Sequence, residues 1–434
     1  MGAHFSKTLT IVRSIKSVLP GKKSRIILAD TQNYAWVGAR FSRYCDAFEV
    51  LQVRDVSQKE EYIKEMVRIG RKHKITGFLP VSVPRSATPD SLACEELMST
   101  LAAYSNFDRP YHVSAKMCEA LDNKLIFCQY CEVLGVTAPK TVIVNSDEEA
   151  HQLNMELRSQ YQSDHNQMIL KNLSYDCLHR LDLFTLPTNS ENLEIYLQKI
   201  RKEGNAISPT NPWTAQTKLT GREYSAACII RNGALKLTTV CESSPSQLRF
   251  EHTEHVKICA WLEKFVSRMN ERNNNVNENE LNLNNCQLCF DFIEVGNNVY
   301  PIECNPRVHS QLSVFSCSDV GKYVLGAALL NIDLPKNILK EASKNKIMAC
   351  KVLHFGDELF KSVFRLNNYK SETNKIDFSV FWDNDADLCL KDPVPFFMKL
   401  HFQLPILLLQ NIWKKRPWKK LDFCIGKVVE LNGE

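Results

Sequence analysis

The most informative stretch of the chain is Cys289-Phe-Asp-Phe-Ile-Glu-Val-Gly-Asn-Asn-Val-Tyr-Pro-Ile-Glu-Cys-Asn-Pro-Arg-Val-His309. Two segments of alternating apolar and polar residues flank Gly296-Asn297-Asn298, which predicts a β-hairpin with a three-residue loop. If the valines on either side of this loop face each other, Asp291 lies directly opposite Glu303, with Cβ atoms about 4.5–5.5 Å apart. Two carboxylates so close repel each other, so the pair makes physical sense with a divalent cation between them or a shared proton.

The second strand of this hairpin continues the polar face. Side chains alternate along a strand, so Asn305, Arg307 and His309 follow Glu303 on the same side. Carboxylate and amide oxygens suit Mg²⁺, with Mn²⁺ as an alternative, and an arginine just beyond them can hold a phosphate. The pattern therefore predicts a magnesium–phosphate site. The plainer alternative is a polar surface hairpin with an accidental charge pair.

Asp291, Glu303 twelve residues later, and then Asn305 and Arg307 resemble the signature of the ATP-grasp ligases. The resemblance implies that the first three hold magnesium against the phosphates of ATP, and that Arg307 and an upstream lysine are catalytic. The other residues that it implies for ATP are Lys124, Lys171 (the catalytic lysine), the hinge residues Gln216, Thr217, Lys218 and Leu219, and Glu223 on the ribose. Taken alone, each of the two lysines would be an ordinary solvated side chain.

Further short stretches are similar to the ATP-grasp ligases of mycosporine biosynthesis, which join glycine to 4-deoxygadusol. They are 38–43, 170–176, 180–182, 211–213, 241–244, 303–310 and 418–427. This resemblance implies an ATP- and Mg²⁺-dependent ligase, and it suggests substrate contacts at Arg40, Arg43, Glu242, Ser243, His309 and Ser310. Arg40 or Arg43 is predicted to bind the carboxylate of glycine. The segment after Lys171 departs from the wider superfamily because it has no glycine-rich lid loop.

Strand-length apolar runs alternate with helical patterns in the first part of the chain, which predicts an α/β domain with a parallel sheet. The resemblance implies an ATP-grasp fold, in which two α+β subdomains grip ATP, with a helical C-terminal segment. The predicted segments are a lone helix at 1–20, an α/β domain at 21–111, an ATP-grasp domain at 112–335 with its lid at 140–212, a disordered asparagine-rich insertion at 273–285, and a family-specific region at 336–434. Single helices are predicted over 115–134 and through 40–44.

Composition narrows the class of protein further. The net charge of +5 over 434 residues makes no case for nucleic acid, and no P-loop or dinucleotide-binding glycine motif occurs. The sixteen cysteines accompany no secretory apolar segment, which favours reduced thiols in the cytoplasm. The two CxxC pairs, Cys128/Cys131 and Cys286/Cys289, fit buried small side chains better than a zinc site.

Two other functions stay open. The chain could be a carboxylate–amine ligase that works through an acyl phosphate. It could also be a membrane-peripheral nucleotide-binding protein without ligase activity, since Gly2 and Ser6 fit a myristoylation pattern and 396–420 is apolar and then basic. The polar interruptions in 396–413 argue against a transmembrane helix. A helix packed on the protein is the favoured interpretation of that segment, and a homodimer is one open oligomeric state.

Overall fold

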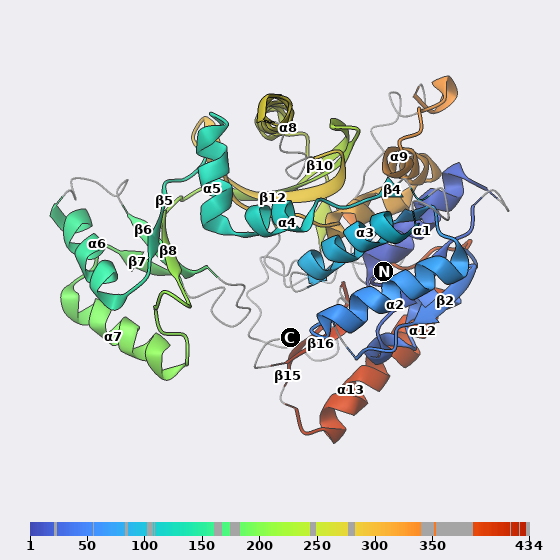
Figure 1. Cartoon of the computed structure of the whole chain (residues 1–434), viewed down its shortest axis with the longest axis horizontal. Helices are drawn as coiled ribbons and strands as arrows, with labels where there is room; N and C mark the ends of the chain where they lie inside the picture. The colour runs from blue at the N-terminus through green and yellow to red at the C-terminus, as the bar shows by residue number, and fades with distance from the viewer. Residues whose placement is uncertain are drawn as a thin grey trace. The chain divides into compact units, whose positions relative to one another are not determined.

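The computed structural model describes residues 1–20, 24–54, 56–82, 86–101, 107, 109–159, 167–173, 183–243, 249–276, 283–339, 351–352, 385–416, 418–424 and 426–430. These residues form two compact units. Unit 1 contains Met1–Cys118, Tyr224–Cys289 and Asn305–Glu430, and unit 2 contains Glu119–Glu223 and Phe290–Cys304. Figure 1 labels many of their helices and strands.

The first part of unit 1 is an α/β arrangement with parallel strand pairs, as the sequence predicts. Strand β1 (Ile27–Asp30) pairs with β2 (Ala47–Val50), and β3 (Gly77–Phe78) pairs with β4 (Arg109–Pro110). Helices α2 (Lys59–His73) and α3 (Ala87–Leu101) pack together over a core that includes Leu51, Tyr62 and Leu97. Acidic residues begin α2 and basic residues end it, which matches the helix dipole.

The predicted helix through residues 40–44 is wrong. The structure has two short 3₁₀ helices there, η2 (Gln32–Tyr34) and η3 (Gly38–Phe41). The chain leaves η3 because Ser42 takes an extended conformation and its hydroxyl donates to the Asp392 carboxylate at 2.8 Å.

Helix α1 (Ser6–Val18) is not the lone helix that the sequence predicts, because it packs against α9 (Asp319–Leu330). A Cβ atom on Gly326 of α9 would lie 2.1 Å from the carbonyl oxygen of Ser14, so the two helices touch through backbone. Gly2 is also buried, and a Cβ atom there would lie 2.3 Å from the carbonyl oxygen of Val81. An acyl chain on Gly2 would therefore have to leave a packed core.

A four-stranded sheet has the order β10–β9–β12–β13. Its strands are β9 (Arg222–Arg231), β10 (Ala234–Glu242), β12 (Asn285–Val295) and β13 (Asn298–Asn305). Unit 1 also contains the strand pair β11 (Phe250–Glu251) and β14 (Lys351–Val352) and the helix η7 (Ser310–Cys317), whereas Phe290–Cys304 of the sheet belongs to unit 2. The buried side chains of Ile229, Cys289 and Leu325 belong to one core cluster of this unit.

The β12–β13 turn is shorter than predicted. Strand β12 ends at Val295 and β13 begins at Asn298, so the loop is Gly296-Asn297, with a left-handed φ of 57° at the glycine. A loop of two residues changes the register that a three-residue loop would set. The direct pairing of Asp291 with Glu303 therefore cannot be taken from the loop length and stays a prediction.

The asparagine-rich insertion is only partly what the sequence predicts. Helix α8 (Val256–Val276) continues into it, and β12 starts at its last residue. Leu283, inside the tract, is fully buried. Only 277–282 lies outside the described residues, so the predicted disordered range of 273–285 is too wide at both ends.

Unit 2 contains the antiparallel sheet β5–β8–β6–β7. Its strands are β5 (Thr141–Val144), β6 (Met168–Asn172), β7 (Phe184–Leu186) and β8 (Trp213–Thr217). Helices α6 (Asp147–Ser159) and α7 (Ser190–Lys202) contact each other, and their apolar side chains share one core with Trp213 and Leu170 of the sheet.

The single helix predicted over 115–134 is two helices, α4 (Ala115–Asp122) and α5 (Lys124–Val133). Asn123 between them is extended, and its side chain accepts hydrogen bonds from the backbone of Leu125 and Ile126, each at 3.0 Å. Asparagine is a strong N-cap, so the chain starts a new helix at this point.

The C-terminal part of unit 1 is helical, as predicted, and ends in a hairpin. It contains α12 (Val394–Met398), the π-helical turn η9 (Lys399–Gln403), α13 (Leu404–Trp413) and the strands β15 (Trp418–Asp422) and β16 (Lys427–Glu430). Among the described helices, none has the length and apolar character needed to cross a membrane.

Thirteen cysteines of the described residues are free thiols, which agrees with the expectation of reduced cysteines. Cys317 differs, because it is disulfide-bonded. Both CxxC pairs are buried. Burial raises the pKa of Cys131 and Cys286.

Candidate active site

Lys171 lies in the sheet of unit 2, on strand β6. Strand β6 pairs with β8 so that Ile169 is opposite Gln216 and Lys171 is opposite Thr214. Side chains alternate along a strand, so Lys171 and Gln216 share one face. The Nζ atom of Lys171 donates to Oε1 of Gln216 at 3.4 Å. The amide of Gln216 is buried and also donates to Thr141 at 3.2 Å, which fixes the group that holds the lysine.

The surroundings of Lys171 combine burial with charges of both signs. Burial lowers the pKa of Lys171, the carboxylates of Glu303 and Glu223 raise it, and the ammonium of Lys124 lowers it. All four charged residues belong to unit 2. They are also four of the residues that the sequence predicts for nucleotide and metal, so this part of the prediction converges in space.

Lys124 and Glu303 form an ion pair, with Nζ and Oε2 3.2 Å apart. Lys124 is the first residue of α5, placed there by the Asn123 cap, and Glu303 lies near the end of β13. Both side chains keep about a quarter of their surface exposed, at 22% and 28%. An ion pair of this exposure exchanges readily with another charged partner, since solvent screens it.

The predicted Gly-x-Glu motif has a steric basis at its glycine. A Cβ atom on Gly221 would lie 1.9 Å from the carbonyl oxygen of Glu294 on β12. Only glycine fits this contact without a backbone shift. The contact fixes the start of β9, and thereby Glu223, against the hairpin that carries Asp291.

The predicted hinge, Gln216 to Leu219, begins in the last two residues of β8 and continues beyond the strand. Its backbone is partly engaged, because the N–H of Thr217 donates to Lys140 and that of Lys218 donates to Gln167, at 2.9 and 2.8 Å. The side chain of Lys218 also donates to Gln167, at 3.0 Å. The contact of this hinge with adenine remains a prediction.

The two resemblance stretches 170–176 and 211–213 meet through β6 and β8. Asn172 of the first donates to Oδ1 of Asn205 at 2.6 Å and of Asn211 at 3.2 Å. These asparagines bind each other, which gives them a structural role. The segment after Lys171 that lacks a glycine-rich lid loop lies mostly in 174–182, outside the described residues.

Solved structures with a similar fold include biotin carboxylase from Campylobacter jejuni in a β,γ-ATP complex, at 13% identity and a TM-score of 0.53 over 77% of this chain and 70% of that one. An ADP complex of N5-carboxyaminoimidazole ribonucleotide synthetase matches at 12% identity and 0.53, over 85% of this chain and 87% of that one. The L-amino acid ligase from Bacillus licheniformis matches at 10% identity and 0.50, over 75% and 73%.

The chain has the ATP-grasp fold. Neither a protein-family model nor a curated protein matches the sequence. At identities this low the likeness establishes the ATP-grasp fold alone, so function has to be argued from the site.

Two predicted residues of the ATP-grasp site, Asn305 and Arg307, belong to unit 1. The guanidinium of Arg307 donates to Oδ1 of Asn305, and its backbone N–H donates to the Asn305 carbonyl at 2.8 Å. The amide oxygen predicted to bind metal is therefore held by Arg307 in this structure. Asn305 lies two residues after Glu303 on β13.

The donor chemistry around β13 fits a hard divalent cation. Glu303 and Asp291 supply carboxylates, and Asn305 supplies a neutral oxygen. Within the described ranges, His, Cys, Asp and Glu form no cluster of three or more that could hold a metal ion. A cation held by these two carboxylates would therefore need further oxygens, such as those of a bound phosphate, to complete its coordination.

The predicted glycine-binding arginines have other described contacts. Arg40 donates to the Ala35 carbonyl at 2.9 Å and stacks over the rings of Trp36 and Phe48. Arg43 donates to the Lys391 carbonyl at 3.2 Å. Only Arg40 lies in a helix, η3, which ends at Phe41, and the role of both arginines stays a prediction.

The other predicted substrate residues are also placed in unit 1. Glu242 and Ser243, at the end of β10, are exposed. His309 caps η7, where its Nδ1 atom accepts from the backbone of Gln311 at 3.3 Å. The carbonyl of Ser310 accepts from the hydroxyl of Ser313 at 2.8 Å. Their contacts with a substrate stay a prediction.

Sequence reasoning missed Lys7, which lies buried beside the Arg307 segment. Its Nζ atom donates to the carbonyls of Val308 at 2.7 Å and Ser82 at 3.1 Å. The pKa of Lys7 is lowered to about 7, mainly by burial and next by the nearby positive charge of Arg307. Lys7 and Val308 are 301 residues apart, so no local pattern could have revealed the contact.

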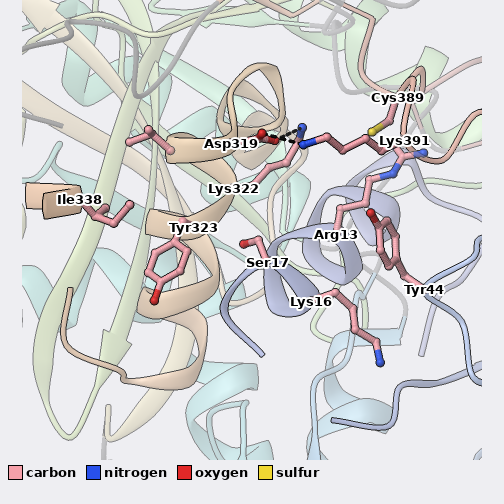
Figure 2. Close-up of a pocket in the computed structure, with 11 residues that line it drawn as sticks. Arg13, Lys16, Ser17, Tyr44, Asp319, Lys322, Tyr323, Ile338, Cys389 and Lys391 are labelled. Atoms are coloured by element: carbon pink, nitrogen blue, oxygen red, sulfur yellow. Dashed lines mark hydrogen bonds and ion pairs between the residues drawn. The ribbon is translucent and has the colours of Figure 1, made fainter. Parts of the chain in front are cut away.

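A pocket of about 410 Å³ is lined by other residues of unit 1. Figure 2 shows Lys322 and Lys391 directed at Asp319, with Nζ to carboxylate distances of 3.6 and 2.7 Å. Arg13 in the same pocket is bound to Asp392 at 3.0 Å. Four basic residues and one acidic residue line it, and the lining shares no residue with the predicted ATP or metal set.

Proposed function

We propose that the protein is an ATP-dependent ligase that uses the Lys124–Lys171–Glu303 site to bind and transfer the phosphates of ATP. The observation that carries the proposal is the convergence of Lys171, Lys124, Glu303 and Glu223 in one unit. A half-buried lysine between acids and a second lysine suits a polyanion, because a bound phosphate would replace the carboxylates as partner. The ATP-grasp fold supports this assignment.

In this proposal the residues of the site divide the work. Lys171, held by Gln216, and Lys124, released from Glu303, would position the phosphates. Glu223 would accept from the ribose, and Arg307 would meet the charge of the transferred phosphoryl group. Magnesium would be held by Asp291, Glu303 and Asn305, and when bound it would offset negative charge on the phosphates.

At a finer level we propose mycosporine-glycine synthase activity, in which glycine is coupled to 4-deoxygadusol. The support is the ordered set of short sequence resemblances. The enolic oxygen of the ring would attack the γ-phosphorus of ATP and release ADP. The amine of glycine would then add to the activated carbon, lose a proton, and expel phosphate, because phosphate is a far better leaving group than hydroxide.

The test is to incubate purified protein with ATP, Mg²⁺, glycine and 4-deoxygadusol, and to follow ADP release and the ultraviolet spectrum. We expect ADP and a shifted absorption band only when all components are present. ADP formation with other amines and carboxylates, but none with the cyclic enone, would instead identify a carboxylate–amine ligase. Absence of ATP turnover with any acceptor would contradict both enzymatic assignments and favour a nucleotide-binding protein without ligase activity.

A further inference from the structure

The C-terminal helix of unit 1 buries two polar side chains, Lys399 and Gln403, and exposes several large apolar ones. Elements α12, η9 and α13 form one continuous helical segment from Val394 to Trp413, since the residues at both junctions keep helical dihedral angles. At about 1.5 Å per residue, such a segment is roughly 30 Å long.

The inner face is held by buried polar groups. The ammonium of Lys399 donates to the Asp387 carboxylate at 2.7 Å and to the Phe423 carbonyl at 2.5 Å. The amide of Gln403 accepts from the backbone of Gly38 at 2.9 Å and donates to the His4 carbonyl at 3.2 Å. Both side chains are only 3% exposed. The inner face therefore has a stable structural role.

The outer face carries six apolar side chains that are about half or more exposed. They are Val394, Phe397, Phe402, Leu409, Ile412 and Trp413. Trp413 is 84% exposed and Leu409 is 64% exposed. Leu409, Ile412 and Trp413 follow the i, i+3, i+4 spacing of one helical face. An apolar face of this length is unfavourable in water, so it implies a partner.

Charge identifies the kind of partner. Lys414, Lys415 and Arg416 directly follow the outer face and are exposed, and no acidic residue occurs from 393 to 420. A second copy of this face would bring like charges together, which disfavours a symmetric dimer through it. Anionic lipid head groups attract basic residues, while tryptophan and leucine enter the interface below them.

We propose that the outer face and Lys414–Arg416 form a docking surface for an anionic membrane, on which the helix lies flat. The proposal goes beyond the ligase function and does not depend on it. Attachment is peripheral and reversible, because the apolar face is one side of one helix and the opposite side is bonded to the protein. Salt weakens it, because part of the attraction is electrostatic.

The test is sedimentation of the full-length protein with vesicles of phosphatidylcholine, with and without phosphatidylserine. We expect binding only with phosphatidylserine, and loss of it at high salt. The variant Leu409→Ser/Ile412→Ser/Trp413→Ser and the variant Lys414→Gln/Lys415→Gln should each lower the partition coefficient by about tenfold or more. Both should keep the wild-type melting temperature and rate of ADP release, because the changed residues are exposed.

The matched control is Val256→Ser, which removes an apolar side chain that is 82% exposed on α8. It should bind vesicles like the wild type. Failure of the wild type to bind phosphatidylserine vesicles would overturn the proposal, and so would binding that survives the triple serine change. A dimer in solution that the serine variant abolishes, without any vesicle binding, would assign the face to a second copy instead.

Discussion

Lys171 of unit 2 and Lys7 of unit 1 are both lysines whose pKa is lowered by burial, but their partners differ in kind. Lys171 is surrounded by the side chains of Glu303, Glu223 and Lys124. Lys7 donates to two backbone carbonyls, and Arg307 adds like charge beside it. Side-chain partners can rearrange around a ligand, whereas backbone carbonyls in a packed core cannot. The comparison teaches that a lowered lysine pKa alone does not mark a phosphate site.

The largest expected effect is that of Lys171→Met. Removing this ammonium should lower the rate of ADP formation by about a hundredfold to a thousandfold, because it would no longer stabilise charge on the phosphates. Stability should be kept or raised, since a half-buried charge is replaced by an apolar chain. The rate is measured under saturating ATP and Mg²⁺. The control is Lys140→Met, an exposed lysine of the same unit, and an unimpaired Lys171→Met enzyme would remove Lys171 from the site.

Glu303→Gln should lower ADP formation by about a hundredfold and raise the Mg²⁺ concentration needed for half-maximal rate, because one carboxylate ligand is lost. The loss of stability should be small, about 0.2–1 kcal/mol, since the ion pair with Lys124 is partly exposed. A Mg²⁺ titration and a denaturant melt measure the two effects. Glu294→Gln on the same hairpin should change neither, and an unaltered Mg²⁺ requirement in Glu303→Gln would argue against metal ligation.

Lys7→Met should change how stability depends on pH. The pKa of Lys7 is about 7 in the folded chain and 10.5 ordinarily, so the unfolded chain binds more protons between these values. Because of Lys7, the free energy of unfolding therefore rises with pH across that window, by at most about 1.4 kcal/mol per pH unit. Lys7→Met should flatten the rise in urea unfolding between about pH 7.5 and pH 9.5. Lys59→Met, an exposed lysine on α2, should leave the rise intact, and an equal slope in Lys7→Met would contradict the assignment.

The smallest effect is expected for replacing 277–282 by a short Gly/Ser bridge. This keeps the buried Leu283 and the first residue of β12, and loop length enters the stability only logarithmically. Activity should stay within about twofold and stability within about 0.5 kcal/mol of the wild type. Removing Leu283 as well should destabilise the protein by about 2–5 kcal/mol, as for other large core truncations. Equal melting temperatures for the two deletions would show that Leu283 contributes nothing.

The residues that could be predicted from the sequence are those fixed by local pattern. Lys171 and Gln216 could be placed at strand ends, and their convergence with Lys124 and Glu303 followed from the order of motifs. Asparagine is a common N-cap residue, so Asn123 could have indicated a helix break, but the sequence pattern predicts a single helix there. The predicted hairpin loop is one residue longer than the observed one, because Asn298 is as compatible with a turn as with a strand.

The remaining features depend on contacts between distant parts of the chain. Burial of α1 is set by α9, more than 300 residues away. The polarity of 394–413 suggests an amphipathic helix, but the inward direction of Lys399 and Gln403 depends on Asp387 and Gly38. Sequence periodicity cannot show which face of a helix the rest of the protein covers.

The π-helical turn between α12 and α13 has a consequence for this helix. The backbone N–H of Leu404 donates to the carbonyl of Lys399, five residues earlier, so the turn absorbs one extra residue. A wheel drawn at a uniform 100° per residue would therefore misplace everything beyond Gln403. Deleting one residue within this turn should leave both halves in phase, whereas deleting one from α13 would rotate Trp413 by about 100°. Within the helical segment 394–413, homologous chains should tolerate a one-residue deletion only in the π-helical turn Lys399–Gln403.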